Sequence, residues 1–420
     1  MSEAFGRRNG ELCAEAVALR EIAERVGTPV YVYSKTTLVE RYTELDAAFT
    51  GVPHLICYAI KANMNLAVVR SLVVCGAGVD ITAGGELYRA RRAGADPQKI
   101  VYSGVGKTAA EIEQALDAGI KLFNVESRAE LRRIDAVAAA RGVVAPIAFR
   151  VNPDVDPKTH PYISTGLRTS KFGIPMEEAL AAYAEAKTLE HVRPVGVGCH
   201  IGSQLIETAP FADALARVRE LVRELRSAGH CIEVIDAGGG LGVRYRDETP
   251  PPTRQYADAV LGAVGDLACE LILEPGRWLV ADAGVLVTRV LYEKKSAEKH
   301  FIIVDAAMND LLRPALYEAH HAIETIAQPR SGNAEVDVVG PVCESGDFLA
   351  RGRALPPLEA GDLLAVRSAG AYGFAMASNY NGRRRPAEVL VHGARYAVVR
   401  ERESYEDLAR GENLGEELET

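Results

Sequence analysis

The sequence lacks a basic excess: 48 lysine and arginine residues stand against 57 aspartate and glutamate residues, and the formal net charge is −9 at pH 7. This balance argues against nucleic acid or an anionic membrane as partner. The chain also lacks an apolar run of about 18 residues, and residues 1–20 contain no signal-peptide core. We therefore expect a soluble, cytoplasmic protein that binds small molecules or other proteins.

Cysteine spacing argues against two further classes of protein. The seven cysteines are odd in number, and none forms a Cys-x-x-Cys pair. This pattern indicates neither a disulfide framework nor a zinc module, and we expect no bound metal. It fits a protein of the reducing cytoplasm. The cysteines occupy positions 13, 57, 75, 199, 231, 269 and 343.

Alternating strand and helix patterns indicate the fold of the larger part of the chain. Between about residues 55 and 280, eight apolar runs alternate with stretches of helical spacing. These runs lie near residues 55, 79, 101, 122 and 147, and at Pro194–Ser203, Cys231–Leu241 and Cys269–Leu279. Eight such units predict an α/β fold, a (β/α)₈ barrel of the TIM type, with a doubly wound open sheet as the alternative.

The pattern differs on either side of these units. Residues 15–26 predict an amphipathic helix and residues 30–34 a strand, and after residue 280 short strands follow with little helix. We predict a cofactor-binding barrel over residues 30–280 and a β-rich barrel or sandwich domain over residues 1–29 with 281–420. The acidic tail after Ser404 predicts a solvated helix or a frayed end.

One lysine stands at the end of an apolar run. A strand over Leu55–Ile60 would leave Lys61 at the carboxyl edge of the sheet, where a barrel gathers its chemistry. Such a lysine often packs its stem and extends its amine to water. In a partly desolvated pocket it instead becomes a nucleophile that forms a Schiff base with an aldehyde cofactor. This stretch alone leaves both interpretations open.

Two glycine-rich stretches invite a phosphate-binding interpretation. Asp236–Gly242 follows a strand candidate, and clustered glycines let backbone amides approach a phosphate, although a tight turn is equally consistent. Val243 breaks the spacing typical of dinucleotide folds. In Gly104–Thr108, Val101 stands where a nucleotide-binding loop needs glycine, so we predict a strand-to-helix turn with Thr108 as a possible helix cap.

Polar residues at other predicted strand ends and loops each have two interpretations. Glu274 and Arg277 would project into the barrel mouth or pair with each other, and His200, near Ser203, would be catalytic or structural. In the β-rich part, Cys343 would transfer protons or pack as a small hydrophobe. Arg313 and Tyr317, four residues apart, would bind a carboxylate or form a turn, and Tyr372 lies in a loop of small residues.

These motifs together resemble those of the fold-type III decarboxylases of amino acids, which use pyridoxal phosphate (PLP), and most closely the diaminopimelate decarboxylases. The resemblance extends from about Gly27 to about Val391. The motifs that carry it are Tyr58–Asn63, Gly84–Leu87, His160–Gly166, Lys171–Ile174, His200–Ser203, Gly238–Gly240, Glu274–Arg277 and Cys343–Asp347.

The resemblance implies a role for each matching residue. Lys61 would bond to PLP, His200 would stack on its ring, and Glu274 would face the ring nitrogen. Cofactor binding is implied for Lys61, His200, Ser203, Gly238, Gly239, Gly240, Glu274, Gly276, Arg277 and Tyr372. Substrate binding is implied for Arg277, Arg313, Tyr317, Glu344 and Tyr372. Cys343 is the candidate proton donor, and the resemblance implies a homodimer in which Cys343 and Glu344 enter the neighbouring subunit's site.

These roles lead to an expected reaction. A carboxylate at the ring nitrogen keeps that nitrogen protonated and favours decarboxylation over racemisation. Arg277, Arg313 and Tyr317 suit a distal carboxylate, and Glu344 suits an ammonium group. We expect conversion of meso-diaminopimelate to L-lysine and CO₂. The alternatives are another decarboxylase for a polyamine precursor or arginine, an amino-acid racemase, and a non-catalytic PLP-binding regulator.

Overall fold

The protein consists of two compact units. The computed structural model describes residues 4–155 and 170–415. The barrel unit comprises residues 37–281, and the β-rich unit comprises residues 1–36 with 282–420. The boundary between the two units lies after Thr36, and not before residue 30 as the sequence predicts. The reason is that strand β4 (Val30–Ser34) pairs with strands β14 (Gly284–Lys295) and β20 (Ala387–His392) of the β-rich unit.

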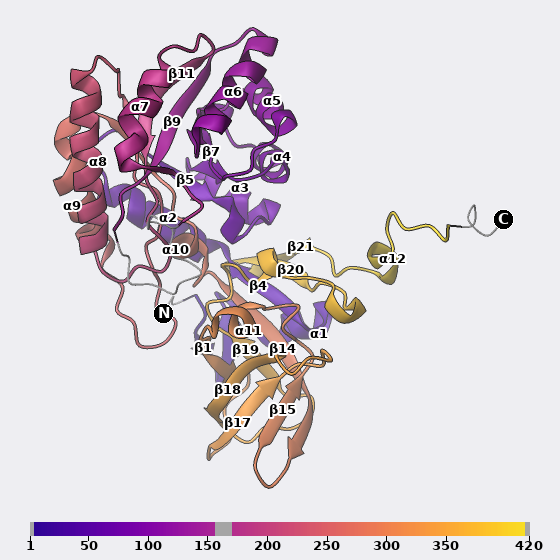
Figure 1. Cartoon of the computed structure of the whole chain (residues 1–420). Helices are drawn as coiled ribbons and strands as arrows, with labels where there is room; N and C mark the ends of the chain where they lie inside the picture. Colours follow the sequence, from indigo (N-terminus) through magenta and orange to yellow (C-terminus); the bar gives the residue numbers. More distant parts are fainter. Residues whose placement is uncertain (1–3, 156–169, 416–420) are drawn as a thin grey trace. The chain divides into compact units, whose positions relative to one another are not determined.

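Parallel strands form a closed barrel in the barrel unit (Figure 1). In the described part of the chain, its eight strands are β5 (His54–Ala59), β6 (Gly78–Ile81), β7 (Ile100–Tyr102), β8 (Leu122–Val125), β9 (Ala145–Asn152), β11 (Val192–Gly198), β12 (Val234–Asp236) and β13 (Glu270–Leu273). Pairing of β8 with β9, in which Phe123 lies opposite Ile147, closes the ring. The short strand β10 (Ile174–Pro175) extends β9. The predicted TIM-type barrel is therefore confirmed.

Helices alternate with these strands. They are α2 (Lys35–Ala48), α3 (Leu66–Val74), α4 (Gly84–Arg92), α5 (Ala109–Ala118), α6 (Arg128–Arg141), α7 (Met176–Ala186), α8 (Ala209–Ser227), α9 (Thr253–Val264) and α10 (Arg277–Val280). A cluster of buried side chains from the strands packs together: Leu55, Cys57, Val101, Leu122, Ala148, Val195, Val234 and Ile272. Leu55 and Cys57 are two apart on β5, as expected for side chains on one face of a strand. This packing makes the barrel interior a core and leaves the strand ends for chemistry.

A second core organises the β-rich unit. Its main sheet has the order β18-β17-β15-β14-β4-β20-β21, with β16 and β19 attached. The other strands of these sheets are β15 (His300–Val304), β16 (Ile323–Thr325), β17 (Ala334–Val339), β18 (Phe348–Leu355), β19 (Leu363–Val366) and β21 (Arg395–Arg400). Val32, Val285 and Val389, from three of its strands, belong to one buried cluster with Ile22 of helix α1 (Leu19–Val26).

The amino-terminal helix is shorter than its pattern predicts. Strand β3 (Val17–Ala18) pairs with strand β2 (Glu11–Ala14), so α1 begins at Leu19 and not near residue 15. Strand β1 (Arg7–Arg8) completes this small sheet. Two short helices, α11 (Arg313–Tyr317) and α12 (Tyr405–Leu408), belong to the same unit.

Two general properties of the chain follow from the structure. All seven cysteines are free thiols. Among the described residues, none of the helices combines the length and apolar character needed to cross a bilayer.

The turn at Gly104–Thr108 is a structural feature, as predicted. Thr108 accepts a hydrogen bond from the Glu111 amide, and the Glu111 carboxylate accepts one from the Thr108 amide, which forms a capping box for α5. The fully buried Nζ of Lys107 donates to the carbonyls of Gly104 and Asn124, both at 2.8 Å, and to Glu130 at 2.6 Å. These three bonds use every proton of the ammonium group, so Lys107 is not placed to bind a phosphate.

Thr108→Ala should therefore loosen α5. Loss of a threonine cap typically costs about 1 kcal/mol, so hydrogen exchange of the first-turn amides of α5 should accelerate about fivefold. Thr108→Ser keeps the oxygen acceptor and serves as the matched control. Unchanged exchange in the alanine variant would contradict the capping role.

Candidate active site at the barrel mouth

Lys61 lies where the sequence places it, directly after strand β5, in the short 3₁₀ helix η1 (Ile60–Ala62). Its Nζ donates to Oδ2 of Asp80 at 2.8 Å. The Asp80 side chain is fully buried on strand β6, whereas the Lys61 side chain is 39% exposed. Asp80 thus orients the amine, which remains accessible to a molecule in the barrel mouth.

Two more buried carboxyl groups occupy the same strand ends. Asp236 is the last residue of β12, and Glu274 follows β13. Burial raises the pKa of Glu274 well above its ordinary value; Asp236 and Asp80 raise it further, and Lys61 opposes the rise. Burial also raises the pKa of Asp236. These carboxyl groups therefore tend to keep a proton, and a cationic group bound in the mouth would favour their ionised forms.

Ser103 and Asn124 hold these carboxyl groups. Asn124 Nδ2 lies 2.8 Å from Oδ2 of Asp236 and 3.2 Å from Oε1 of Glu274. Ser103 Oγ also donates to Oε1 of Glu274, at 3.2 Å. Asp80, Ser103, Asn124 and Asp236 were not among the predicted site residues. The available signal was a polar residue within the last two residues of an apolar strand or directly after it.

His200 is held as a neutral imidazole at the end of β11. The Gly239 amide donates to Nδ1 of His200 at 3.1 Å, which leaves the ring proton on Nε2. Burial lowers the pKa of His200 well below its ordinary value, and the charges of Arg150 and Lys61 lower it further. Arg150 also donates to the His200 carbonyl at 3.3 Å. A neutral ring fixed in this way suits stacking against a planar ligand.

The glycine run after β12 approaches other backbone segments too closely for side chains. A Cβ on Gly238 would lie 2.4 Å from the Cys199 carbonyl oxygen, one on Gly239 would lie 2.1 Å from that of Glu274, and one on Gly240 would lie 2.5 Å from that of Gly202. Gly238 and Gly240 also have positive φ. Glycine is therefore required here, and the run links the His200–Ser203 turn to Glu274.

Arg277 and Ser203 lie together in the same unit. Arg277 donates from Nη2 to Ser203 Oγ at 3.0 Å and from Nη1 to the Tyr245 hydroxyl at 2.8 Å. Arg277 is buried and opens helix α10, directly after Gly276. An anion bound between Ser203 and Arg277 would meet a hydroxyl and a guanidinium group.

The β-rich unit holds the other predicted site residues. Arg313 is buried, its Nε donates to Nε2 of His321 at 3.3 Å, and its guanidinium carbon lies 6.0 Å from the centroid of the Tyr317 ring. The His321 Nδ1 lies 2.8 Å from the Arg367 carbonyl oxygen and so carries the ring proton. Arg313 and Tyr317 are thus brought together on α11.

Cys343 and Glu344 lie in an exposed loop of the β-rich unit. The carboxylate of buried Asp347 accepts bonds from the Val342 and Met308 amides, both at 2.7 Å, and anchors this loop. The Tyr380 hydroxyl donates to Glu344 at 3.2 Å.

Tyr372 is half-buried and has φ of 55° in the same unit. Its neighbour Gly373 approaches the Ala369 carbonyl so closely that a Cβ would lie 2.4 Å away. The motif His160–Gly166 lies outside the described residues.

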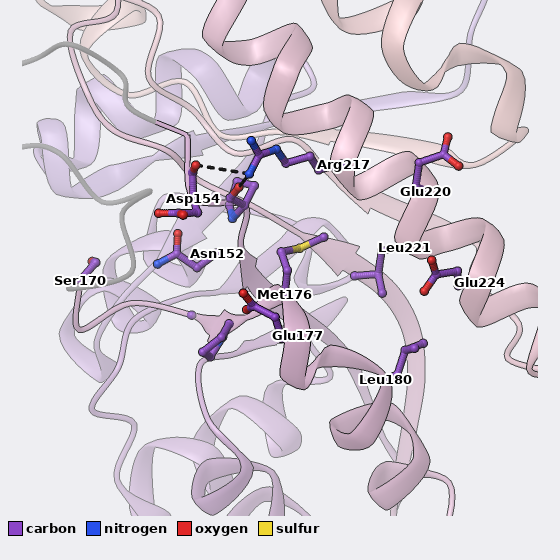
Figure 2. Close-up of a pocket in the computed structure, with 13 residues that line it drawn as sticks. Asn152, Asp154, Ser170, Met176, Glu177, Leu180, Arg217, Glu220, Leu221 and Glu224 are labelled. Carbon is purple, nitrogen blue, oxygen red and sulfur yellow. Dashed lines mark hydrogen bonds between the residues drawn. The ribbon is translucent and has the colours of Figure 1, made fainter.

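A separate cavity of about 520 Å³ lies at the side of the barrel, where β9 ends beside α7 and α8 (Figure 2). Its described lining is Asn152, Pro153, Asp154, Ser170, Gly173, Pro175, Met176, Glu177, Leu180, Arg217, Glu220, Leu221 and Glu224. Arg217 donates to the Pro153 carbonyl at 2.5 Å, and the carboxylates of Glu177, Glu220 and Glu224 are poorly suited to a phosphate. This cavity therefore does not suit a phosphorylated cofactor, in contrast to the barrel mouth at Lys61.

Comparison with known proteins gives a consistent result. Residues 35–281 match the family model described as pyridoxal-dependent decarboxylase, pyridoxal binding domain. A diaminopimelate decarboxylase of Pseudomonas aeruginosa is 53% identical over 98% of this chain and 99% of its own length. The chain belongs to the diaminopimelate decarboxylase family.

Solved structures of this family resemble the chain throughout. The diaminopimelate decarboxylase of Helicobacter pylori complexed with L-lysine is 45% identical, with a TM-score of 0.91 over 93% of this chain and 98% of that one. The enzyme of M. jannaschii is 40% identical, with a TM-score of 0.94 over 99% of both chains. The match to the pyridoxal binding domain ends where the barrel unit ends, at residue 281.

The residues at the barrel mouth fit the PLP that this family requires. The Lys61 amine is accessible, the run Gly238–Gly240 leaves no room for side chains, and a neutral His200 adjoins that run. Oδ1 of Asp80 is buried without a hydrogen-bond partner in the described structure, which is a sign of a site completed by a ligand or water. The chain therefore has the groups that a PLP enzyme of this family needs.

Gly239→Ala distinguishes a cofactor cradle from an ordinary turn. Its Cβ would meet the Glu274 carbonyl, so the backbone must move, and we expect PLP binding to weaken at least about tenfold, equivalent to about 1.4 kcal/mol. An absorbance titration of the apoprotein with PLP measures this loss.

Gly262→Ala is the matched control for this change. Gly262 lies within α9, where a Cβ would meet nothing within 4 Å, and alanine favours the helix. Native PLP affinity in Gly239→Ala would show that the run serves only as a turn.

Proposed function

We propose that this chain releases CO₂ from meso-2,6-diaminopimelate and forms L-lysine, the last step of lysine biosynthesis, with PLP as cofactor. One observation carries the proposal: the accessible Lys61 amine is held at the barrel mouth by Asp80 and interacts electrostatically with buried Glu274. A carboxy-lyase of this kind needs an amine to hold the cofactor and a carboxylate to control its ring. Family membership supports the same reaction.

Individual residues of the barrel unit are proposed to hold PLP. Lys61 would bond to its aldehyde carbon, and His200 would stack on its ring. The phosphate would be bound by Ser203, Arg277 and the backbone of Gly238–Gly240. Gly276 would let the backbone approach the cofactor closely, and Tyr372 of the β-rich unit would contribute a hydroxyl. The bond between Arg277 and Ser203 supports this assignment because both side chains already converge on one point.

Glu274 is proposed to direct the chemistry toward decarboxylation. When bound, PLP supplies a conjugated ring that accepts the electron pair left by loss of CO₂. The Glu274 carboxylate would hold a proton on the ring nitrogen, and an arginine in its place would not. Burial beside Asp236 and Asp80 supports this role, because a protonated ring would offset the negative charge of the three carboxyl groups.

Substrate selection is proposed to rest mainly on the β-rich unit. The guanidinium groups of Arg313 and Arg277 would bind the distal carboxylate together with the hydroxyl of Tyr317 or Tyr372, and Glu344 would bind the distal ammonium group. Arg313 supports this proposal because it is buried and oriented by His321. A substrate without a distal carboxylate would forgo these charge-assisted hydrogen bonds, which is costly in a buried site.

We further propose a cytoplasmic homodimer in which Cys343 donates a proton to the substrate carbon in the neighbouring subunit's site. Cys343 is exposed in a loop anchored by Asp347, which supports its availability to a second subunit. The free thiols are consistent with a reducing compartment.

The reaction itself is tested with the purified protein and PLP. We expect CO₂ and L-lysine in equal amounts from meso-diaminopimelate, and rates at least about a hundredfold lower with ornithine or arginine, because those substrates lack the distal carboxylate. Borohydride reduction followed by peptide mass spectrometry should locate the cofactor on Lys61. Faster release from ornithine, or stereoisomer exchange without CO₂, would overturn the proposal.

Mixing two inactive variants tests the shared site. Lys61→Ala and Cys343→Ala should each have little activity alone. After random subunit exchange, half of the dimers are mixed and each holds one intact site, so about a quarter of native activity should return.

Two controls accompany this experiment. Each variant exchanged with itself should stay inactive, and size-exclusion chromatography with light scattering should show a dimer throughout. Full activity of Cys343→Ala alone would remove Cys343 as the proton donor, and absence of recovery on mixing would place it in its own chain's site.

A further inference from the structure

The amide of Asn124 joins two buried carboxyl groups. Asn124 lies on β8 and is 4% exposed. Its Nδ2 donates to Asp236 at 2.8 Å and to Glu274 at 3.2 Å, and lies 3.1 Å from Ser103 Oγ. Each contact comes from a different strand end, so this one nitrogen atom connects four strands of the barrel.

The position of Asn124 is itself fixed by the barrel. Its carbonyl accepts a bond from buried Lys107 at 2.8 Å. Gly198, on β11, packs beside it: a Cβ there would lie 3.4 Å from Asn124 Oδ1, an ordinary contact, and 3.3 Å from the Asp236 Cβ, a tight one. The bonds from Nδ2 to Asp236 and Glu274 orient the side-chain amide, with its donor toward the carboxyl groups.

The other end of the amide distinguishes this residue from an ordinary structural asparagine. Oδ1 of Asn124 is buried and has no hydrogen-bond partner among the described residues. Buried polar atoms are normally paired, and an unpaired one costs about 1–3 kcal/mol. The unpaired Oδ1 therefore lowers stability, while the same amide places its N–H donor between Asp236 and Glu274.

A donor at this position changes the basicity of Glu274. Beyond burial, the charge of Asp236 and a side-chain hydrogen bond shared with it raise the pKa of Glu274, because two ionised carboxylates repel each other strongly in a buried site. The amide N–H stabilises the ionised form of each, so it keeps Glu274 a weaker base than burial alone would make it. A weaker base at the cofactor ring leaves the proton on the ring nitrogen and not on the carboxyl group.

We propose that Asn124 is a positioning residue of the cofactor site: it holds Glu274 toward the PLP ring nitrogen and keeps the shared proton on the ring. This inference rests on the proposed role of Glu274. The charged or titratable groups that face the pair are Asp80 of β6, Lys61 of η1, Cys57 of β5 and Cys199 directly after β11, and Tyr256 of α9 faces Asp236. None of these donates to both carboxyl groups.

Two variants test the proposal in the PLP-loaded enzyme. Asn124→Leu removes the donor at similar volume, and Asn124→Asp keeps the shape but replaces the donor by a carboxyl group. With PLP labelled with ¹⁵N in its ring, the native enzyme should give the NMR shift of a protonated ring nitrogen. Both variants should move the shift toward that of an unprotonated ring. Their kcat should fall about tenfold to a hundredfold, with KM within about twofold.

Two further variants separate positioning from simple structural loss. Tyr183→Phe removes one buried hydrogen bond, 2.6 Å to the Gly196 carbonyl, and should lower thermal stability without changing the ring-nitrogen shift. Glu274→Gln should move the shift at least as far as Asn124→Leu. If Asn124→Leu does not fold, the ring-nitrogen shift of the isosteric Asn124→Asp variant tests the positioning role.

The two proposals fail in distinguishable ways. A protonated ring and native kcat in a folded Asn124 variant would overturn the positioning role, while CO₂ release by the native enzyme would leave the proposed function intact. If native enzyme bound PLP but released no CO₂ from diaminopimelate, the proposed function would fail. The ring-nitrogen shifts of the Asn124 variants would still decide the positioning role.

Discussion

Burial of negative charge is the constraint on which the barrel mouth depends. Asp80, Asp236 and Glu274 lie at the carboxyl ends of three strands, where bulk water stabilises them little, and one lysine ammonium opposes them. Three ionised carboxylates with one cation would be strongly unfavourable in such a site. The arrangement persists because Ser103, Asn124 and the Gly238 amide donate to two of the carboxyl groups. A cationic ring bound there would restore the balance of charge.

Close backbone approach is the second constraint, and it links the charged groups to one another. The Gly239 amide orients His200, the Gly238 amide binds Asp236, and the Gly239 Cα packs against the Glu274 carbonyl. One short run therefore sets the position of the His200 ring and of two acids. A side chain on this run would disturb all three, which explains why three successive glycines follow strand β12.

The sequence predicted the elements that depend on local pattern. Eight apolar runs specified the barrel, and the end of the run before Lys61 located the amine on the correct strand edge, because side-chain periodicity and strand direction determine both. The helix at the amino terminus was predicted too long, since pairing of Val17–Ala18 with β2 overrides local propensity. The boundary at residue 30 differs for a similar reason, because β4 pairs with strands more than 250 residues away in sequence.

The supporting residues of the site depend on long-range geometry that spacing does not encode. Asn124 and Glu274 are 150 residues apart, yet they share a hydrogen bond because β8 and β13 belong to one closed ring. In sequence Asn124 is merely a polar residue in a four-residue strand. The closed barrel places the Asn124 amide between two acids, and its contacts with them depend on that placement. Closure of the sheet thus converts scattered polar strand ends into a single electrostatic unit, and it is this unit, more than Lys61 alone, that would determine how the bound ring holds its proton.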